Sequence, residues 1–183
     1  MAYDEATAQL GRKFAIAVLA VDQLKAYAGV HGKPVVEQVL KLVAPKVQAS
    51  CQAGRVFRVS GEELTLLFYH LSALDALVEL ENIRKNIEST SLQLRDGRRV
   101  WENARAVTSP GRKDQALPIT VSIGVADAEA EGATRGMVIK AAYRALYEAK
   151  AGGGNAVKRG TPGAEVFRRS YSPSAAVMSS GDY

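Results

Sequence analysis

Two short apolar runs flank a tight turn in the stretch Arg55-Val-Phe-Arg-Val-Ser-Gly-Glu-Glu-Leu-Thr-Leu-Leu-Phe-Tyr-His70. β-Branched and aromatic residues are frequent in both runs, which predicts strands over 55–59 and 64–70. The residues between them, Ser60 to Glu63, contain a glycine and are typical of a short hairpin connection. The sequence therefore predicts a β-hairpin over 55–70, and the remaining elements are placed relative to it.

Before the hairpin, the chain carries one unbroken apolar run, Phe14-Ala-Ile-Ala-Val-Leu-Ala-Val21. A continuous run of this length suits a strand that is buried on both faces. Valines and a leucine then recur at helical spacing and predict a helix over 35–49, which Pro45 should bend or split because proline removes a hydrogen bond. Residues 2–12 are typical of the end of a helix.

After the hairpin, helical spacing predicts a helix over 72–89, with Leu74, Leu77, Leu80, Ile83 and Ile87 on one face. Residues 90–116 are basic and show little periodicity, so we expect a long surface hairpin or loop there. Alternating apolar and small residues over 119–125 predict a strand. A second helix over 134–150 should end at the glycines 152–154, and 155–158 is a candidate for a short last strand.

This order of elements gives a β-α-β-β-α-β core, which is α+β in class. We expect a ferredoxin-like or palm-type mixed β-sheet flanked by helices, and we expect those helices on one face. The sequence predicts one domain over 1–160. Residues 161–183 are rich in Ser, Pro, Gly and Ala and should form a disordered C-terminal tail.

The composition excludes several classes of protein. The longest apolar run has eight residues, which is too short to cross a bilayer, and the N-terminus lacks the pattern of a secretory signal. Cys51 is the only cysteine, so no disulfide can form within the chain, and a cytoplasmic location is expected. The net charge of +5 is modest, and the basic clusters hold too few aromatic residues for a base-stacking platform, which argues against a nucleic-acid partner.

Carboxylates occur at two places that the predicted topology should bring together. Asp22 ends the buried strand, and the hairpin turn carries Gly61-Glu62-Glu63. Two carboxylates at such an edge can hold divalent ions on the phosphates of a nucleotide, and the glycine would let a phosphate approach backbone N–H groups. The ordinary alternative is a solvated turn, because glycine and acidic residues are common turn formers.

Four sequence blocks carry a resemblance to a known family. Arg58-Val-Ser-Gly-Glu-Glu-Leu64 resembles R-Y-G-G-D/E-E-F, and Ile119-Thr-Val-Ser-Ile-Gly-Val-Ala126 resembles T-V-S-I-G-V-A. Ala141-Ala-Tyr-Arg-Ala-Leu-Tyr-Glu-Ala-Lys150, followed by Gly153 and Asn155, resembles A-D-x-A-L-Y-x-A-K-x-x-G-R-N. Val21-Asp-Gln-Leu-Lys25 with Gly32 is a looser match to D-x-D-x-F-K…N-D…G-H. Over about residues 2–159 the chain resembles a GGDEF domain, the domain of diguanylate cyclases.

The resemblance implies a set of site residues. Glu62 matches a metal-binding acid. The family gives Asp22 no metal role, but Asp22 could share the face of residue 20 and supply a second ligand if the strand continues. Glu62, Glu63 and Lys25 would be the vestiges of a catalytic set. If GTP binds, the resemblance implies that it contacts Gly61, Glu37, Lys25 and Lys150. No resident cofactor is expected, and Mg²⁺ would accompany GTP.

The departures from the family pattern bear most directly on function. The first metal-binding Asp falls on Ala20, the guanine-reading Asn on Ala28, and the phosphate-binding Arg on Gly154. The Asp of A-D-x-A-L-Y falls on Tyr143. The inhibitory R-x-x-D motif falls on Cys51 and Gly54, so the primary cyclic di-GMP site should be absent, while a secondary product contact through Arg84 stays open.

These losses favour a catalytically inactive, degenerate GGDEF domain. It would serve as a regulatory or protein-interaction module in cyclic di-GMP signalling, with a protein partner, another GGDEF domain or a sensor domain, and it could form a homodimer. Two alternatives stand beside this hypothesis. One is a diguanylate cyclase that makes cyclic di-GMP from two GTP molecules with an altered metal site. The other is a sensor that binds GTP without turnover.

Overall fold

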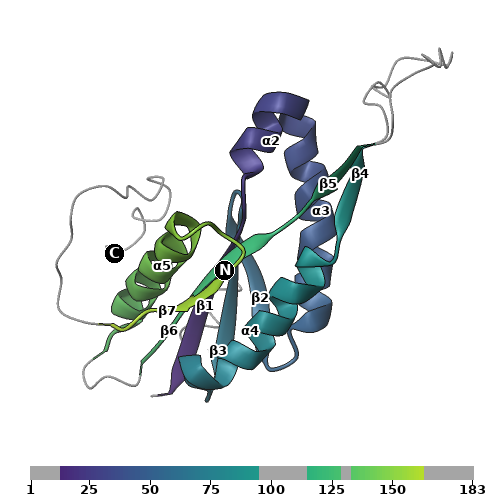
Figure 1. The fold of residues 1–183 in the computed structure, drawn as a ribbon. Coiled ribbons are helices and arrows are strands. Elements are labelled where there is room, and N and C mark those ends of the chain that lie inside the picture. Colours follow the sequence, from purple (N-terminus) through teal and green to yellow (C-terminus); the bar gives the residue numbers. More distant parts are fainter. Residues whose placement is uncertain (1–12, 95–114, 129–132, 163–183) are drawn as a thin grey trace, which may run out of the picture.

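The computed structural model describes residues 13–94, 115–128 and 133–162. Its main sheet has five strands in the order β2-β3-β1-β6-β7 (Figure 1). The central strand β1 (Phe14–Val21) pairs antiparallel with β3 (Glu63–Tyr69) and with β6 (Val121–Asp127). β2 (Gly54–Ser60) forms one edge, and β7 (Val157–Arg159), parallel to β6, forms the other. The predicted hairpin is therefore confirmed as β2 and β3.

Helices cover both faces of this sheet, which corrects the expectation of helices on one face. α3 (Lys33–Ser50) and α4 (Ala73–Glu88) pack in one cluster of buried side chains, and α5 (Arg135–Ala151) packs in another. Successive residues of β1 alternate between the two clusters, and all eight are buried. The uninterrupted apolar run is the physical reason, because a strand that is apolar on both sides needs a layer on each.

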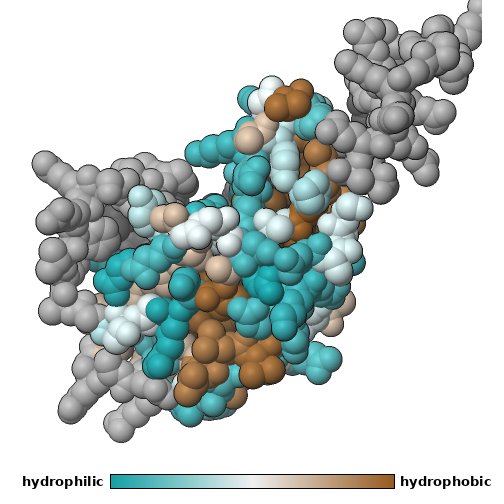
Figure 2. Space-filling view, in the orientation of Figure 1, coloured by the Kyte–Doolittle hydropathy of each residue, from teal (hydrophilic) through white to brown (hydrophobic). Residues whose placement is uncertain are grey.

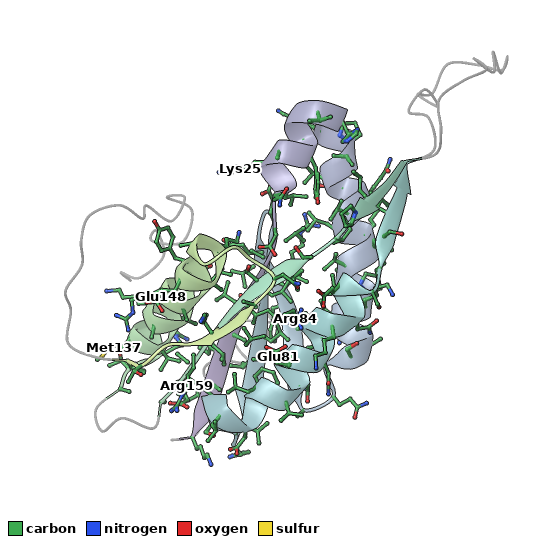
Figure 3. The ribbon with its side chains drawn as sticks, viewed as in Figure 1. Lys25, Glu81, Arg84, Met137, Glu148 and Arg159 are labelled. Atoms are coloured by element: carbon green, nitrogen blue, oxygen red, sulfur yellow. The ribbon has the colours of Figure 1, made fainter. Side chains whose placement is uncertain are left out.

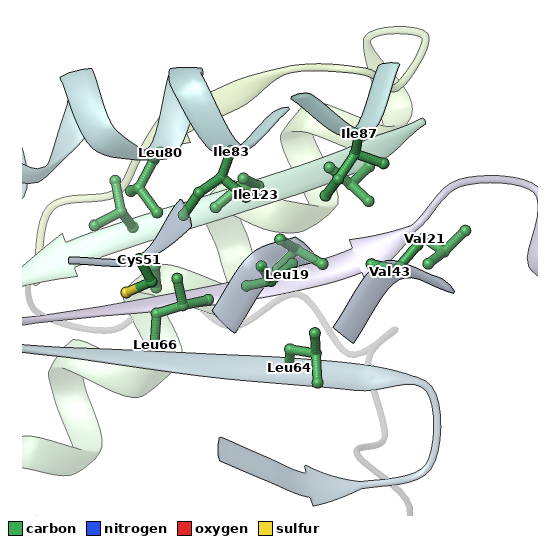
Figure 4. Close-up of a cluster of buried hydrophobic side chains, with 14 of the residues drawn as sticks. Leu19, Val21, Val43, Cys51, Leu64, Leu66, Leu80, Ile83, Ile87 and Ile123 are labelled. Carbon is green, nitrogen blue, oxygen red and sulfur yellow. The ribbon is translucent and has the colours of Figure 1, made fainter. Parts of the chain in front are cut away.

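The larger of the two clusters lies between the sheet and helices α3 and α4. Leu80, Ile83 and Ile87 follow one another along α4 and lie over Ile123 of β6 (Figure 4). All four are at most 1 % exposed. Leu74, however, is 61 % exposed, so the buried stripe of α4 begins with alanines and not with Leu74 as the spacing predicted.

The region from 22 to 50 differs from its prediction in two ways. α2 (Leu24–His31) was not predicted, because Gly29, Gly32 and Pro34 interrupt this part of the sequence. Gly32 has φ of +83° and ends α2, and Pro34 lies at the start of α3, so this punctuation marks a junction between two helices. α3 runs through Pro45 without splitting.

The irregular segment contributes a second, smaller sheet. β4 (Ser91–Leu94) and β5 (Gln115–Pro118) pair antiparallel, which confirms a hairpin at the two described ends of the segment. The helix end expected over 2–12 and the tail expected over 161–183, apart from residues 161 and 162, lie outside the described residues. Within the described ranges no helix combines the length and apolarity that a membrane crossing requires. Figure 2 shows a mainly hydrophilic face with apolar side chains gathered near the start of α4.

Candidate functional site

One end of the main sheet brings the predicted site residues together. β1 ends there, the β2–β3 turn lies there, β6 begins there, and α5 ends there (Figure 1). The register pairs Ala20 of β1 with Glu63 on one side and with Ser122 on the other. α2 follows β1 directly and carries Lys25 at this end of the molecule (Figure 3).

Ala20 and Glu63 share the face of the sheet that α5 covers. Ala20 is 3 % exposed and belongs to the cluster of buried residues beneath α5. Glu63 lies opposite it and accepts a hydrogen bond from the hydroxyl of Tyr143 at 2.9 Å. Tyr143 also packs against the same cluster. Glu63, the second acid of the turn, is therefore hydrogen-bonded to a side chain of α5. This bond lies beside Ala20, the position at which the family has an aspartate.

Asp22 is buried at the end of β1, with 8 % of its surface exposed. The hydroxyls of Ser122 and Thr120 donate to its carboxylate at 2.6 and 2.9 Å. The backbone N–H of Asn155 donates to it at 2.8 Å. A buried carboxylate with three donors is satisfied internally, and it ties the end of β1 to the start of β6 and to the loop before β7.

Asn155 extends this network to α4. It has φ of +49°, a left-handed conformation that asparagine tolerates better than most residues. Its side chain accepts from the guanidinium of Arg84 at 2.8 Å and donates to Glu88 at 2.7 Å. Arg84 also donates to Glu81 and to Glu88 at 2.8 Å each, and these bonds raise the pKa of its guanidinium (Figure 3). The Arg84 side chain is only 12 % exposed, and its guanidinium donates hydrogen bonds to other residues of the fold.

A small pocket of about 150 Å³ lies beside Asp22. Its lining comes from the β1–α2 junction, β6, the end of α5 and the glycine loop: Asp22, Gln23, Thr120, Lys150, Gly153 and Gly154. A Cβ placed on Gly154 would meet the Asp22 carboxylate at 3.0–3.2 Å, and Gly154 has φ of +77°. Glycine is therefore favoured at position 154, where the family has an arginine. The left-handed backbone suits glycine, and the Asp22 carboxylate leaves little space for a side chain.

Tyr27 of α2 lies near the same carboxylate. Its hydroxyl donates to the carbonyl oxygen of Pro118 at 2.8 Å. Burial, and to a smaller degree the negative charge of Asp22, raise the pKa of Tyr27. This contact joins α2 to β5 and so helps to place the helix that carries Lys25.

The other predicted residues are exposed at the rim. Lys25, Glu62 and Lys150 are exposed, and within the described part of the chain Glu62 has no hydrogen-bond or ion-pair partner. Glu37 lies 3.8 Å from the guanidinium of Arg58, which also donates to the carbonyl oxygen of Gly61 at 2.9 Å. Arg58 therefore links the turn to the carboxylate of Glu37, which the resemblance implies as a contact of GTP.

The donor set at this edge does not fit the divalent cation that the resemblance implies. Ala20 has no oxygen in its side chain, the buried Asp22 carboxylate already accepts three hydrogen bonds, and Glu63 accepts from Tyr143. Hard cations such as Mg²⁺ require oxygen ligands in a near-octahedral arrangement. Among the described residues, no three His, Cys, Asp or Glu side chains gather to hold a metal ion.

The loop at the positions of the inhibitory motif is closed by a side chain of α4. Glu79 accepts from the backbone N–H of Gln52 at 2.8 Å and from that of Ala53 at 3.2 Å. Burial and Glu79 together raise the pKa of the Cys51 thiol to about 12, so this thiol is unreactive. A Cβ on Gly54 would lie 2.9 Å from the ring of Phe68, and an aspartate there would force the core to shift.

Four hydrogen-bond partners in this site were missed by reasoning from the sequence. Tyr143 was noted as a lost aspartate, but its bond to Glu63 was not foreseen. Glu79 gave no signal, since it is one of several polar residues on α4. Ser122 did give a signal, because a hydroxyl within a buried strand needs a polar partner. Asp22 is that partner, and it also accepts from Thr120 just before the strand.

Comparison with known proteins places this geometry in a family. The family model described as "Diguanylate cyclase, GGDEF domain" matches residues 2–101. Diguanylate cyclase VdcA of Vibrio cholerae is 30% identical over 148 residues, which are 80% of this chain and 39% of that protein. Response regulator PleD of Caulobacter vibrioides is 28% identical over 138 residues, 75% of this chain and 27% of that protein. The chain thus spans well under half the length of these relatives.

Solved structures give the same result. The GGDEF domain of DgcB from Caulobacter crescentus, in complex with c-di-GMP, superposes with a TM-score of 0.66 at 28% identity, covering 80% of this chain and 77% of that one. Diguanylate cyclase SiaD from Pseudomonas aeruginosa, in complex with its activator SiaC, has a TM-score of 0.66 at 25% identity, covering 85% of this chain and 53% of that one. The expected α+β palm-type fold is confirmed by this likeness.

Proposed function

Since this chain belongs to the GGDEF domain family of diguanylate cyclases, we propose that it is a catalytically inactive member that works as a regulatory or protein-interaction module in cyclic di-GMP signalling. The observation that carries the proposal is the state of Asp22. Asp22 is the acid that could stand in for the ligand missing at Ala20, and its buried carboxylate already accepts three hydrogen bonds. Without it, the cation that would organise the triphosphates lacks its second ligand.

The positions that would read the base and hold the phosphates support the same proposal. Ala28 has no amide to hydrogen-bond a guanine, and a site that loses such a bond loses much of its selectivity. The Glu37 carboxylate, which would contact GTP, already lies 3.8 Å from the guanidinium of Arg58 and so has a charged partner within the protein. Gly154 contributes no guanidinium, and its contact with Asp22 leaves little room for a side chain.

The expected loss of rate is large. Phosphoryl transfer depends almost entirely on positioning and on charge stabilisation, and a metal ion contributes several kcal/mol of the latter. Each 1.4 kcal/mol corresponds to about tenfold in rate, so losing the ion alone lowers turnover by roughly a thousandfold or more.

The test is product formation by the purified chain. We expect no cyclic di-GMP after prolonged incubation of micromolar protein with millimolar GTP and Mg²⁺ or Mn²⁺, while an active diguanylate cyclase in parallel forms it. Product that disappears in the variant Glu62→Gln would contradict the proposal, because Glu62 would then be serving a working metal site.

One observation favours a second function, a sensor that binds GTP without turnover. The pocket beside Asp22 is lined by Lys150, and both Lys150 and Lys25 are exposed at this edge. A lysine ammonium is a common phosphate ligand. Nucleotide binding here would change the surface that a protein partner meets, as an activator such as SiaC meets the diguanylate cyclase SiaD.

The proposal of an inactive regulatory module has further parts. It places the GGDEF domain at 1–160 and a disordered tail at 161–183, and it includes a homodimer and a cytoplasmic location.

A further inference from the structure

The hydrogen bond from Tyr143 to Glu63 lies on the α5 face of the sheet, beside Ala20. Glu63 pairs with Ala20 across β1 and β3, and α5 brings the phenol to the Glu63 carboxylate at 2.9 Å. We propose that Tyr143 takes the place of a cation as the partner of Glu63, and that it keeps divalent ions from this edge even when an acid is returned to position 20. The inference rests on the proposed function and explains why one substitution would not reverse it.

The chemistry of the two groups supports this assignment. A partly buried carboxylate needs a donor or a positive charge, because burying it without a partner is unfavourable. The phenol O–H of Tyr143 supplies that donor at 2.9 Å. This hydrogen bond satisfies the carboxylate without bringing in a positive charge. Glu63 therefore has a partner without a metal.

The geometry predicts what an aspartate at position 20 would meet. It would project beneath α5, on the same face as Glu63, into the cluster against which Tyr143 packs. Two facing carboxylates repel each other unless a cation or a donor lies between them. The phenol is already placed to be that donor, so a divalent ion must displace it before both acids can bind the metal.

The test compares Mn²⁺ binding among three variants, followed by the electron paramagnetic resonance signal of free Mn²⁺. Ala20→Asp alone is expected to bind Mn²⁺ weakly. The double variant Ala20→Asp/Tyr143→Phe is expected to bind it about tenfold more tightly, which is the size of one lost hydrogen bond to a charged group. The matched control is Ala20→Asp/Tyr147→Phe, since Tyr147 lies one turn along α5 and is 64 % exposed. Equal Mn²⁺ affinity in all three would overturn the inference.

A second measurement covers the possibility that an acid at the buried position 20 prevents folding. In the native background, Tm is measured with and without millimolar Mn²⁺ for the wild type, Tyr143→Phe and Tyr147→Phe. The inference expects Mn²⁺ to raise the Tm of Tyr143→Phe alone, because only that variant leaves Glu63 without its donor. The same response in all three contradicts it. Cyclic di-GMP made by the wild type would instead contradict the proposed function, so the two failures are distinguishable.

Discussion

Replacing Asp22 with alanine is expected to lower the free energy of unfolding by about 3 kcal/mol, as measured by urea denaturation. The substitution leaves the hydroxyls of Ser122 and Thr120 and the N–H of Asn155 without their acceptor. Ser122 is fully buried, so its hydroxyl cannot turn to water. Each donor stranded in this way costs roughly 1–3 kcal/mol, and the more exposed Thr120 costs least.

The matched control is Glu62→Ala. Glu62 is the other acid implied in metal binding, and it is exposed in the turn with no hydrogen-bond or ion-pair partner among the described residues. Its replacement should leave stability nearly unchanged, as surface substitutions usually do. If both variants unfolded at the same urea concentration as the wild type, Asp22 would be available to a ligand, and the structural role given to it here would be wrong.

Gly124→Ala should be as damaging, with a loss of about 3 kcal/mol or failure to fold. Gly124 lies in β6 directly under α5, and a Cβ there would overlap the carbonyl oxygen of Ala142 and the backbone nitrogen of Leu146. These are backbone atoms of a helix, which cannot move aside as a flexible side chain can. The helix would have to lift from the sheet and would take Tyr143 and Lys150 with it.

Gly136→Ala on the same helix is the control for this second variant. A Cβ at Gly136 would lie 3.9 Å from the hydroxyl of Thr134, which is ordinary van der Waals contact, and alanine is favoured over glycine in a helix by up to about 1 kcal/mol. Thermal unfolding should therefore show Gly136→Ala at or above the wild-type Tm and Gly124→Ala far below it. A Gly124→Ala protein with wild-type Tm would mean that α5 is not seated on β6 as described.

Much of this fold could be predicted because its signals are local. The apolar run 14–21, the hairpin around Ser60–Glu63 and the helical spacing over 72–89 and 134–150 each identify an element within one window of sequence. Which face a helix covers is not local. The double-sided burial of β1 implied two layers, yet only the packing of α5 shows where the second one lies. α2 was hidden because glycine and proline mark helix ends as well as loops.

The same distinction between local and non-local signals applies to the candidate site. The residues missing at Ala20, Ala28 and Gly154 could be read directly, because each is a position within a sequence block. The hydrogen-bond partners of the remaining acids, Asp22 and Glu63, could not be predicted in this way. Asp22 meets donors that lie about a hundred residues further along the chain, and Glu63 meets Tyr143 eighty residues away. Such pairs depend on strand register and helix placement, which no short motif encodes.

A calorimetric titration of GTP with Mg²⁺ into the wild-type chain tests the central claim most directly. The claim is that Asp22 and Glu63 accept hydrogen bonds from within the fold, and that this edge no longer holds a metal–nucleotide complex. It predicts no saturable heat up to millimolar GTP. A saturable binding heat that is lost in Lys150→Ala would contradict it and establish a nucleotide site, and continued heat flow after saturation would further indicate turnover.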